Sequence, residues 1–526
     1  MMSNYLKTRS LFDFGFSHLL FFSLITLLLS ACGKSKVFSE ENKTSVESNQ
    51  SNNSIPQSFQ VSDSLYERQW YLHQKFGINV LPVWEDYLGE GISIAVVDSG
   101  IEALHPDLAG NIDLTRSFRY EDGSSDPSPT EKELENPFVD ASHGTAVAGI
   151  ISALQNDIGI SGVAPKSILV GLNVFSRLDD SSFEDAMKYP GVDISSNSWG
   201  ADLSFGLDDD QVVLDAIVEK MLSVPIIYTF AAGNEESNSG FSSILNSRYT
   251  LVIGATTQNG KIANYSNHGA NILCVAPGGY EDRSVSNIIT TDLIGDLYGY
   301  DVKGDHFDIF ENQNYDYTDS FNGTSAAVPM VSGVIALMLE ANKDLDYRDV
   351  KYILAYSSDK LDNNHTSWIQ NSAGLWVSPY YGFGLVNAQK AVSVAKEFKT
   401  LSKELNISKH LDKLILPIKD NDLKGVDLEF EIDENISVEY VMLEISTNHS
   451  YSGDLKITLT SPSNTTSILA DGGTITEDVY NQWGFSSVAF IDEVSRGNWK
   501  LKISDIVKND TGILSSSKLI IYGHKK

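Results

Sequence analysis

Short apolar segments alternate with helical patterns through the first two thirds of the chain. Five segments of near-continuous apolar and small residues lie at 91–98, 167–174, 192–199, 224–234 and 250–256. Runs of this length are typical of strands buried on both faces of a parallel sheet. Apolar residues at helical spacing lie at 143–154, 208–222 and 325–342. This alternation predicts an α/β domain with a parallel sheet flanked by helices.

The pattern changes after Lys396. Six short segments with partial two-residue alternation, separated by Gly, Asn, Asp, Pro and Ser, lie at 438–447, 453–462, 465–472, 488–493, 498–505 and 518–523. Such segments are typical of an antiparallel sandwich. We therefore expect an α/β domain at 62–395, a connector at 396–410 and an all-β, jelly-roll-like sandwich at 411–526.

Length and composition agree with two folded domains. The chain has 526 residues, of which 42% are hydrophobic and 10% aromatic, and this excludes a wholly disordered protein. Its formal net charge is −32, from 70 acidic and 38 basic residues. Such a charge disfavours nucleic acid as a partner and favours calcium or basic polypeptides, although it is also compatible with a role in solubility alone.

The first residues have the form of a secretion signal. Lys7 and Arg9 precede an apolar stretch at 19–29, which is too short to span a bilayer comfortably and ends in the sequence LSAC. These residues resemble the lipobox of bacterial lipoproteins. The resemblance implies a signal peptide at 1–31, lipidation of Cys32 and, because Gly33 follows, attachment to the outer membrane, facing the periplasm or the exterior. An ordinary cleaved signal with an incidental cysteine is the alternative.

A polar stretch rich in Ser, Asn, Glu and Lys follows, and it predicts a disordered tether at 32–61. Cys274 is the one other cysteine of the chain, so we expect no disulfide within the mature protein. Its apolar surroundings indicate a small buried thiol.

Candidate chemistry centres on Ser325, which lies between small residues in the sequence SFNGTSAAVPM and begins a predicted helix. A serine hydroxyl becomes a good nucleophile when an imidazole accepts its proton and a carboxylate orients that imidazole. His143 begins another predicted helix, and Asp98 follows the first predicted strand. Asn234 ends the strand at 224–234, where its amide is a candidate donor to an oxyanion.

The sequences around these four residues are VVDSGI, HGTAVAG, AAGN and NGTSAAVP. Together, and in this order, they resemble the subtilisin-like serine proteases. The resemblance implies that Ser325 is the nucleophile, His143 the general base and then acid, Asp98 the residue that orients it, and Asn234 the oxyanion donor. It covers most of 62–395 and implies an endopeptidase that hydrolyses proteins through an acyl-enzyme.

A narrower resemblance is to the kexin and furin-like branch. The sequences QWYLHQ, HPDLAGN, SNSWG and YGFGLVNAQKAV are similar to that group, and HSYSGDLKITLTSPS is similar to its P domain. The resemblance implies that the sandwich is needed for folding or stability of the catalytic unit. Ser99 and Val147, in contrast, are more similar to bacterial subtilisins.

The same resemblance implies that Ser198, Trp199 and Gly200 line the extended substrate. Asp202 follows them and is a candidate partner for a basic substrate side chain. The second acidic segment of kexins has no acidic residue here, because 241–247 reads FSSILNS. A preference for basic residues therefore stays open.

The sequence LQNDIGI at 154–160 resembles the strong calcium loop of subtilisins. The resemblance implies calcium bound by backbone carbonyls, an amide oxygen and carboxylates. The residues implied are Leu154, Ile158 and Ile160 for the carbonyls, Asn156 for the amide, and Asp63 and Asp107 for the carboxylates. An ordinary turn is the alternative, and no Cys or His cluster has zinc spacing.

Two further features depart from the family pattern. The segment 294–319 is rich in Asp and Tyr, and we expect a flap over the cleft, a docking surface or a solvated loop. The tether alone precedes the catalytic domain, where relatives carry a propeptide that assists folding, and this suggests a separate folding chaperone.

Two other functions compete with the protease. One is a surface binding or adhesion protein on an inactive protease fold, which the intact set of four residues argues against. The other is a lipid esterase, but Ser325 lies in GTSAA rather than in the GxSxG elbow of those enzymes.

Overall fold

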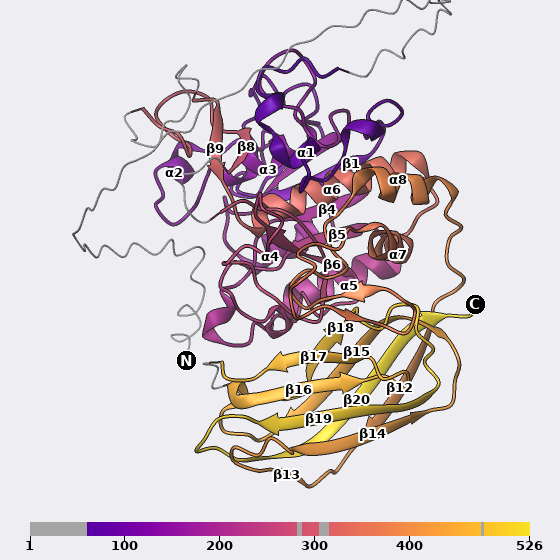
Figure 1. Cartoon of the computed structure of the whole chain (residues 1–526). Helices are drawn as coiled ribbons and strands as arrows, with labels where there is room; N and C mark the ends of the chain where they lie inside the picture. The colour runs from indigo at the N-terminus through magenta and orange to yellow at the C-terminus, as the bar shows by residue number, and fades with distance from the viewer. Residues whose placement is uncertain (1–59, 281–286, 304–314, 475–477) are drawn as a thin grey trace, which may run out of the picture.

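A computed structural model describes residues 60–280, 287–303, 315–474 and 478–526 (Figure 1). The predicted signal peptide, Cys32 and nearly all of the predicted tether lie outside these residues. Figure 1 shows an α/β domain stacked on an all-β domain, with α5, α7 and β18 close to the boundary between them.

The α/β domain is built on a parallel sheet of seven strands in the order β2-β3-β1-β4-β5-β6-β7. Their bounds are Ser93–Asp98 for β1, Phe118–Arg119 for β2, Ile168–Asn173 for β3, Ile194–Asn197 for β4, Ile227–Ala231 for β5, Thr250–Thr256 for β6 and Ile272–Pro277 for β7. The predicted parallel sheet is confirmed, and each of the five predicted segments supplies one strand. Because the strands are parallel, their carboxyl ends lie at one edge, and the strand order changes direction between β1 and β4, where ligands bind in such sheets.

Helices pack against this sheet and against one another. The longer ones are α3 (His143–Ser152), α4 (Asp180–Met187), α5 (Gln211–Ser223), α6 (Thr324–Ala341), α7 (Tyr347–Ser357) and α8 (Ala388–Glu397), and the short ones are α1 (Trp70–His73) and α2 (Glu131–Leu134). Helix α6 packs on β4, β5, β6 and β7, with α3 and α8 beside it. Among the described residues α6 alone is long and apolar enough to cross a membrane, and 89% of its apolar window is buried inside the protein, as in a core helix.

A short hairpin of β8 (Ile288–Thr291) and β9 (Tyr317–Phe321) leads into α6. Thr290 and Thr291 donate their hydroxyl hydrogens to the carbonyl oxygens of Ala146 and Thr145, at 2.6 and 2.7 Å. The hairpin that precedes α6 is thereby attached to α3. Both helices begin at this side of the molecule.

The C-terminal domain is an antiparallel sandwich, as predicted. One sheet has the order β12-β20-β15-β18, with β13 also on β20, and the other has the order β14-β19-β16-β17. The first sheet comprises β12 (Leu405–Leu411), β13 (Leu416–Ile418), β15 (Ser437–Thr447), β18 (Trp483–Ser487) and β20 (Gly512–His524). The second comprises β14 (Val426–Ile432), β16 (Leu455–Thr460), β17 (Thr466–Asp471) and β19 (Gly497–Asp505).

Two details of the sandwich differ from the sequence-based expectation. Strand β12 begins at Leu405, inside the range assigned to a connector, because its backbone pairs with β20 although most of its side chains face solvent. The predicted strand at 488–493 is a series of turns. Asn371 of the α/β domain donates to the carbonyl oxygens of Ala489 and Ile491, at 3.1 and 2.9 Å, so this segment bonds to the other domain as well as to Val438 of β15.

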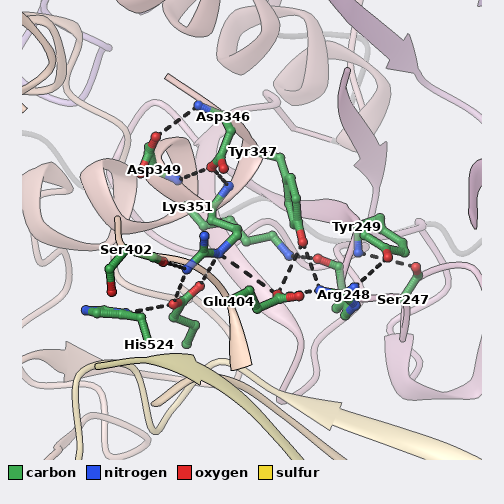
Figure 2. A network of polar contacts seen from close by, with 12 residues as sticks. Ser247, Arg248, Tyr249, Asp346, Tyr347, Asp349, Lys351, Ser402, Glu404 and His524 are labelled. Carbon is green, nitrogen blue, oxygen red and sulfur yellow. Dashed lines mark hydrogen bonds and ion pairs between the residues drawn. The ribbon is translucent and has the colours of Figure 1, made fainter. Parts of the chain in front are cut away.

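Buried polar contacts join the two domains. In Figure 2, Arg248, Lys351, Glu404 and His524 gather between α7 and the sandwich. Lys351 donates to the carbonyl oxygen of Arg248, and Arg248 pairs with Glu404. Elsewhere the indole of Trp483 in β18 donates to the carbonyl oxygen of Gly240, at 3.1 Å. The sandwich is therefore packed directly on the domain that carries the candidate site.

Candidate active site

Asp98 and His143 form the first half of the candidate site. Strand β1 ends at Asp98, and α3 begins at His143, whose Nδ1 lies 2.8 and 3.0 Å from the two carboxylate oxygens of Asp98. Both side chains are buried. Burial lowers the pKa of the His143 imidazole, but the charge and hydrogen bond of Asp98, with a smaller contribution from Asp140, leave that pKa above its usual value.

Steric crowding explains why small residues surround His143. Helix α3 comes so close to the loop after β1 that a Cβ on Gly144 would lie 2.1 Å from the carbonyl oxygen of Gly100. The backbone N–H of Gly144 donates to the hydroxyl of Ser99, at 3.1 Å. This close approach allows the imidazole to meet a carboxylate from the strand end.

Ser325 lies in the first turn of α6 and is buried, with 4% of its surface exposed. Its hydroxyl donates to the carbonyl oxygen of Ser198, at 3.1 Å, and the hydroxyl of Ser198 donates to the carbonyl oxygen of Ser325, also at 3.1 Å. The ring of Phe321, which precedes Ser325 in the turn into α6, contacts the ring of His143, with a centroid distance of 5.4 Å. Ser325 thus lies against the segment that follows β4, and Phe321, the last residue of β9, lies against the imidazole of His143.

Asn234 follows β5 and faces the same turn. Its side-chain oxygen accepts hydrogen bonds from the backbone N–H and the hydroxyl of Thr324, both at 2.9 Å. A Cβ on Gly323 would lie 3.5 Å from the amide nitrogen of Asn234. The amide oxygen is therefore engaged by Thr324, and the amide nitrogen lies beside the turn that carries Ser325, where an oxyanion donor is required.

The residues predicted to line the substrate differ in burial and in hydrogen bonding. The indole of Trp199 is buried edge-on between Phe183 and Phe230, so this side chain belongs to the core and its backbone alone is available to substrate. A Cβ on Gly200 would meet open space. Asp202 caps the short turn at Leu203–Phe205 by accepting from the backbone N–H of Ser204, at 2.9 Å.

Glu235 is a carboxylate that the sequence reasoning missed. It directly follows Asn234 and accepts a hydrogen bond from the side-chain amide of Asn267, at 2.7 Å. Burial raises the pKa of Glu235, and the nearby charge of Asp202 raises it further. An acidic residue next to the AAGN sequence was the available signal. Two carboxylates, rather than Asp202 alone, thus lie on this side of Asn234.

The predicted calcium loop is held by hydrogen bonds to the two predicted carboxylates. One oxygen of Asp63 accepts from the backbone N–H groups of Asn156 and Asp157, both at 2.9 Å, and the other accepts from the Ser161 hydroxyl. Asp63 therefore already uses both oxygens to close the loop.

Asp107 differs from Asp63 in one respect. Its Oδ2 accepts from the backbone N–H of Ile160, at 3.0 Å, whereas its Oδ1 is buried and has no hydrogen-bond partner in the described part of the chain. Burial raises the pKa of Asp107 to about 6. A buried carboxylate oxygen without a donor fits a cation ligand. Among the described residues no three His, Cys, Asp or Glu side chains gather as a metal site, so a cation here would depend on backbone carbonyls as well.

Comparison with protein families assigns both domains. Residues 89–384 match the model of the subtilase family, and residues 438–521 match that of the proprotein convertase P-domain. Furin-1 of Xenopus laevis is 30% identical over 492 residues, which cover 88% of this chain and 59% of that protein. The chain thus spans about three fifths of the length of that relative.

Bacterial relatives match over more of their length. The Aeromonas extracellular serine protease of Aeromonas sobria is 29% identical over 548 residues, covering 85% of this chain and 84% of that protein. The crystal structure of the serine protease of Aeromonas sobria in complex with the chaperone ORF2 superimposes with a TM-score of 0.82 at 26% identity, covering 88% of this chain and 96% of that one. With a subtilase match over more than half of its length and the predicted fold in both domains, this chain belongs to the subtilase family and carries a proprotein convertase P-domain after the catalytic domain.

Proposed function

We propose that the protein is a serine endopeptidase that cleaves proteins through an acyl-enzyme. The observation that carries this proposal is the buried contact of both Asp98 oxygens with Nδ1 of His143. It fixes the tautomer of the imidazole, so that Nε2 can accept a proton. Ser325 at the start of α6 and Asn234 beside it complete the proposed set.

In the proposed reaction, Oγ of Ser325 attacks the carbonyl carbon of the scissile bond while His143 takes the hydroxyl proton. The side-chain amide of Asn234 donates to the oxyanion that develops. His143 then gives its proton to the leaving amine, and an acyl group remains on Ser325. Water, activated by the same imidazole, attacks this ester and restores the serine.

Hydrolysis of casein tests the proposal, with a short-chain ester as the comparison substrate. Wild-type protein should cleave casein, and Ser325→Ala should reduce this cleavage by about 10³-fold or more. A wild-type protein that binds casein without cleaving it would instead support the adhesion hypothesis. Preference for the ester over any peptide would support the esterase.

We also propose that Glu235 and Asp202 give a preference for a basic residue before the cleaved bond. Two partly desolvated carboxylates attract a guanidinium or ammonium group more strongly than one. Glu235 directly follows Asn234, which would bind the carbonyl of the same substrate residue, and the charge of Asp202 acts on Glu235. Sequencing of the cut sites in a proteome-derived peptide library tests this preference.

Calcium is a proposed structural ligand of the loop at 154–160. Asp107 would supply a carboxylate oxygen and Asn156 its amide oxygen, with carbonyls of Leu154, Ile158 and Ile160. Asp63 fits less well than the sequence suggested, because both of its oxygens already hold the loop. The ion would neutralise the buried charge of Asp107 and stabilise the loop, with no part in bond cleavage.

Attachment to the outer membrane through lipid on Cys32 remains a proposal from the sequence. Incorporation of labelled palmitate into wild-type protein and not into Cys32→Ala would support it. We further propose a separate folding chaperone, since the Aeromonas sobria protease was crystallised with the chaperone ORF2. Full activity after expression of this chain alone would contradict the need for one.

A further inference from the structure

The segment after β8 forms a fixed loop around one buried carboxylate. Asp292 accepts hydrogen bonds from the backbone N–H groups of Leu293, Tyr300 and Asp301, at 2.8, 2.7 and 3.0 Å. Gly299 has a φ of 116°, and a Cβ there would lie 2.5 Å from an oxygen of Asp292. The position therefore requires glycine. The next residue, Tyr300, is presented by a closed loop and not by a free one.

Tyr300 reaches the surroundings of the catalytic imidazole in two ways. Its hydroxyl donates to Oδ2 of Asp140, at 2.6 Å. Its ring lies against Phe321, with centroids 5.5 Å apart, and Phe321 in turn contacts the ring of His143. The contact between the loop and the candidate site is thus both polar and aromatic.

Asp140 is fixed at the start of α3. Its Oδ1 accepts from the backbone N–H and the hydroxyl of Ser142, at 3.3 and 2.8 Å, and its backbone carbonyl accepts from the N–H of His143, at 3.3 Å. With Tyr300 on Oδ2, both carboxylate oxygens have donors. The negative charge is therefore held in one place, from which it acts on the imidazole of His143, where a solvated side chain would be free to turn away.

We propose that Tyr300 and Asp140 are a positioning pair for His143, in which the tyrosine hydroxyl holds a second carboxylate where it favours the protonated imidazole. The inference rests on the proposed function, because it concerns the proton that His143 takes from Ser325. It adds two residues to the site, one of them from the segment at 294–319, which departs from the family pattern.

The physical basis is electrostatic. When Ser325 attacks, its proton moves to Nε2 of His143 and the imidazole becomes a cation. Among the described residues, Asp98 from the end of β1 and Phe321 from β9 contact this imidazole, and the charge of Asp140, which lies before α3, also acts on it. Burial lowers the pKa of the imidazole, Asp98 raises it, and Asp140 raises it further. The second carboxylate is therefore expected to make His143 a stronger base.

The pH dependence of kcat/KM in the full-length protein tests this pair. Asp140→Asn keeps the shape and one of the two acceptor oxygens but removes the charge. We expect the acid limb of the profile to move to lower pH by about half a unit, because the imidazole loses a stabilising charge. Tyr300→Phe keeps the ring on Phe321 but frees the carboxylate to turn toward water. It should move the limb in the same direction by a smaller amount and reduce kcat by about threefold to tenfold, with KM nearly unchanged.

Tyr298→Phe is the matched control, since Tyr298 belongs to the same loop, is 38% exposed and has none of these contacts. Its profile should match that of the wild type. If the pH profiles of Asp140→Asn and Tyr300→Phe superimpose on that of the wild type, Tyr300 and Asp140 are not a positioning pair for His143. Fluorophosphonate labelling of each variant shows that its site is folded. A wild type that neither hydrolyses peptides nor becomes labelled would refute the proposed function instead, so the two failures are distinguishable.

Discussion

Arg348 of α7 and Glu439 of β15 form a bidentate ion pair between the two domains. Nε of Arg348 lies 2.8 Å from one carboxylate oxygen of Glu439, and Nη2 lies 2.7 Å from the other. Both side chains are at least nine-tenths buried. Nδ1 of His524 lies 2.7 Å from the same carboxylate. The P-domain is thus joined to the catalytic domain by charges that are largely shielded from water.

Removal of one partner of this pair should destabilise the protein strongly. Glu439→Ala leaves the Arg348 guanidinium buried without its carboxylate, and we expect a loss of about 3–5 kcal/mol in the free energy of unfolding. Urea denaturation measures it. Glu429→Ala is the control, because its partner Lys500 lies 3.9 Å away and both side chains are more than half exposed. That variant should change stability by less than about 1 kcal/mol. Equal effects of the two changes would contradict the role of the buried pair.

Truncation before β12 should give no soluble, active catalytic domain. Without the sandwich, the side chains of Arg348 and Lys351 are no longer covered. The apolar surface of the catalytic domain that Trp483 covers also becomes exposed to water. Expression of residues 1–404 followed by gel filtration and a casein assay measures the outcome. Full activity of the truncated protein would show that the P-domain is dispensable for folding.

Stability should rise with pH through the titration of Lys351. Burial, with the charge of Arg248, lowers the pKa of this ammonium to about 7, so between that value and the ordinary lysine pKa the unfolded chain binds more protons. The free energy of unfolding should therefore increase with pH from about 7.5 to 9, by up to about 1.4 kcal/mol per unit relative to Lys351→Met. Parallel curves for the two proteins in urea denaturation would contradict this.

The sequence predicted the catalytic domain better than its contact with the P-domain. The strands and helices of the sheet follow from apolar runs, and the four candidate residues from short sequences with defined roles. Arg348 and Lys351 look like the solvated face of an amphipathic helix in the sequence LDYRDVKYIL. The sandwich and the segment around Arg248 pack on α7 and bury them, and these long-range contacts have no local periodicity.

Contacts around the candidate site also join residues far apart in the chain, and local sequence patterns do not predict such contacts. Tyr300 lies in a segment that departs from the family pattern, and the bond to Asp140 spans 160 positions of the chain. The sequence places Glu235 directly after Asn234, but the burial of Glu235 depends on Asn267 from another loop. The segment at 488–493 has the composition of a strand, yet Asn371 binds its carbonyls and turns it toward the catalytic domain.

Calcium removal should lower the thermal stability of the wild type through the loop at 154–160. We expect EDTA to lower the melting temperature by several degrees, and excess calcium to restore it, because a bound ion stabilises the folded state. In Asp107→Asn the effect of calcium should be greatly reduced, since the buried oxygen that it would bind loses its charge. Asp86→Asn, at a side chain that is 70% exposed, is the control and should respond like the wild type. An undiminished response of Asp107→Asn would exclude this residue as a ligand.

Charge removal at Glu235 should alter the selection of substrate. Glu235→Gln keeps the size and the contact with Asn267 but removes one of two carboxylates, so kcat/KM for a peptide with Arg before the cut should fall by about tenfold or more relative to a Leu peptide. Asp209→Asn, in an exposed turn before α5, is the control. An unchanged Arg-to-Leu ratio would remove Glu235 from the specificity pocket.

The most direct test of the account is covalent labelling with a fluorophosphonate probe, which reacts with an activated serine. Wild-type protein should take up close to one equivalent at Ser325, as located by peptide mass spectrometry, while Ser325→Ala takes up none and His143→Ala reacts at least about 10³-fold more slowly. A folded wild type that stays unlabelled, or an Ser325→Ala variant that is labelled as before, would contradict the assignment of Ser325, His143 and Asp98 as the catalytic centre.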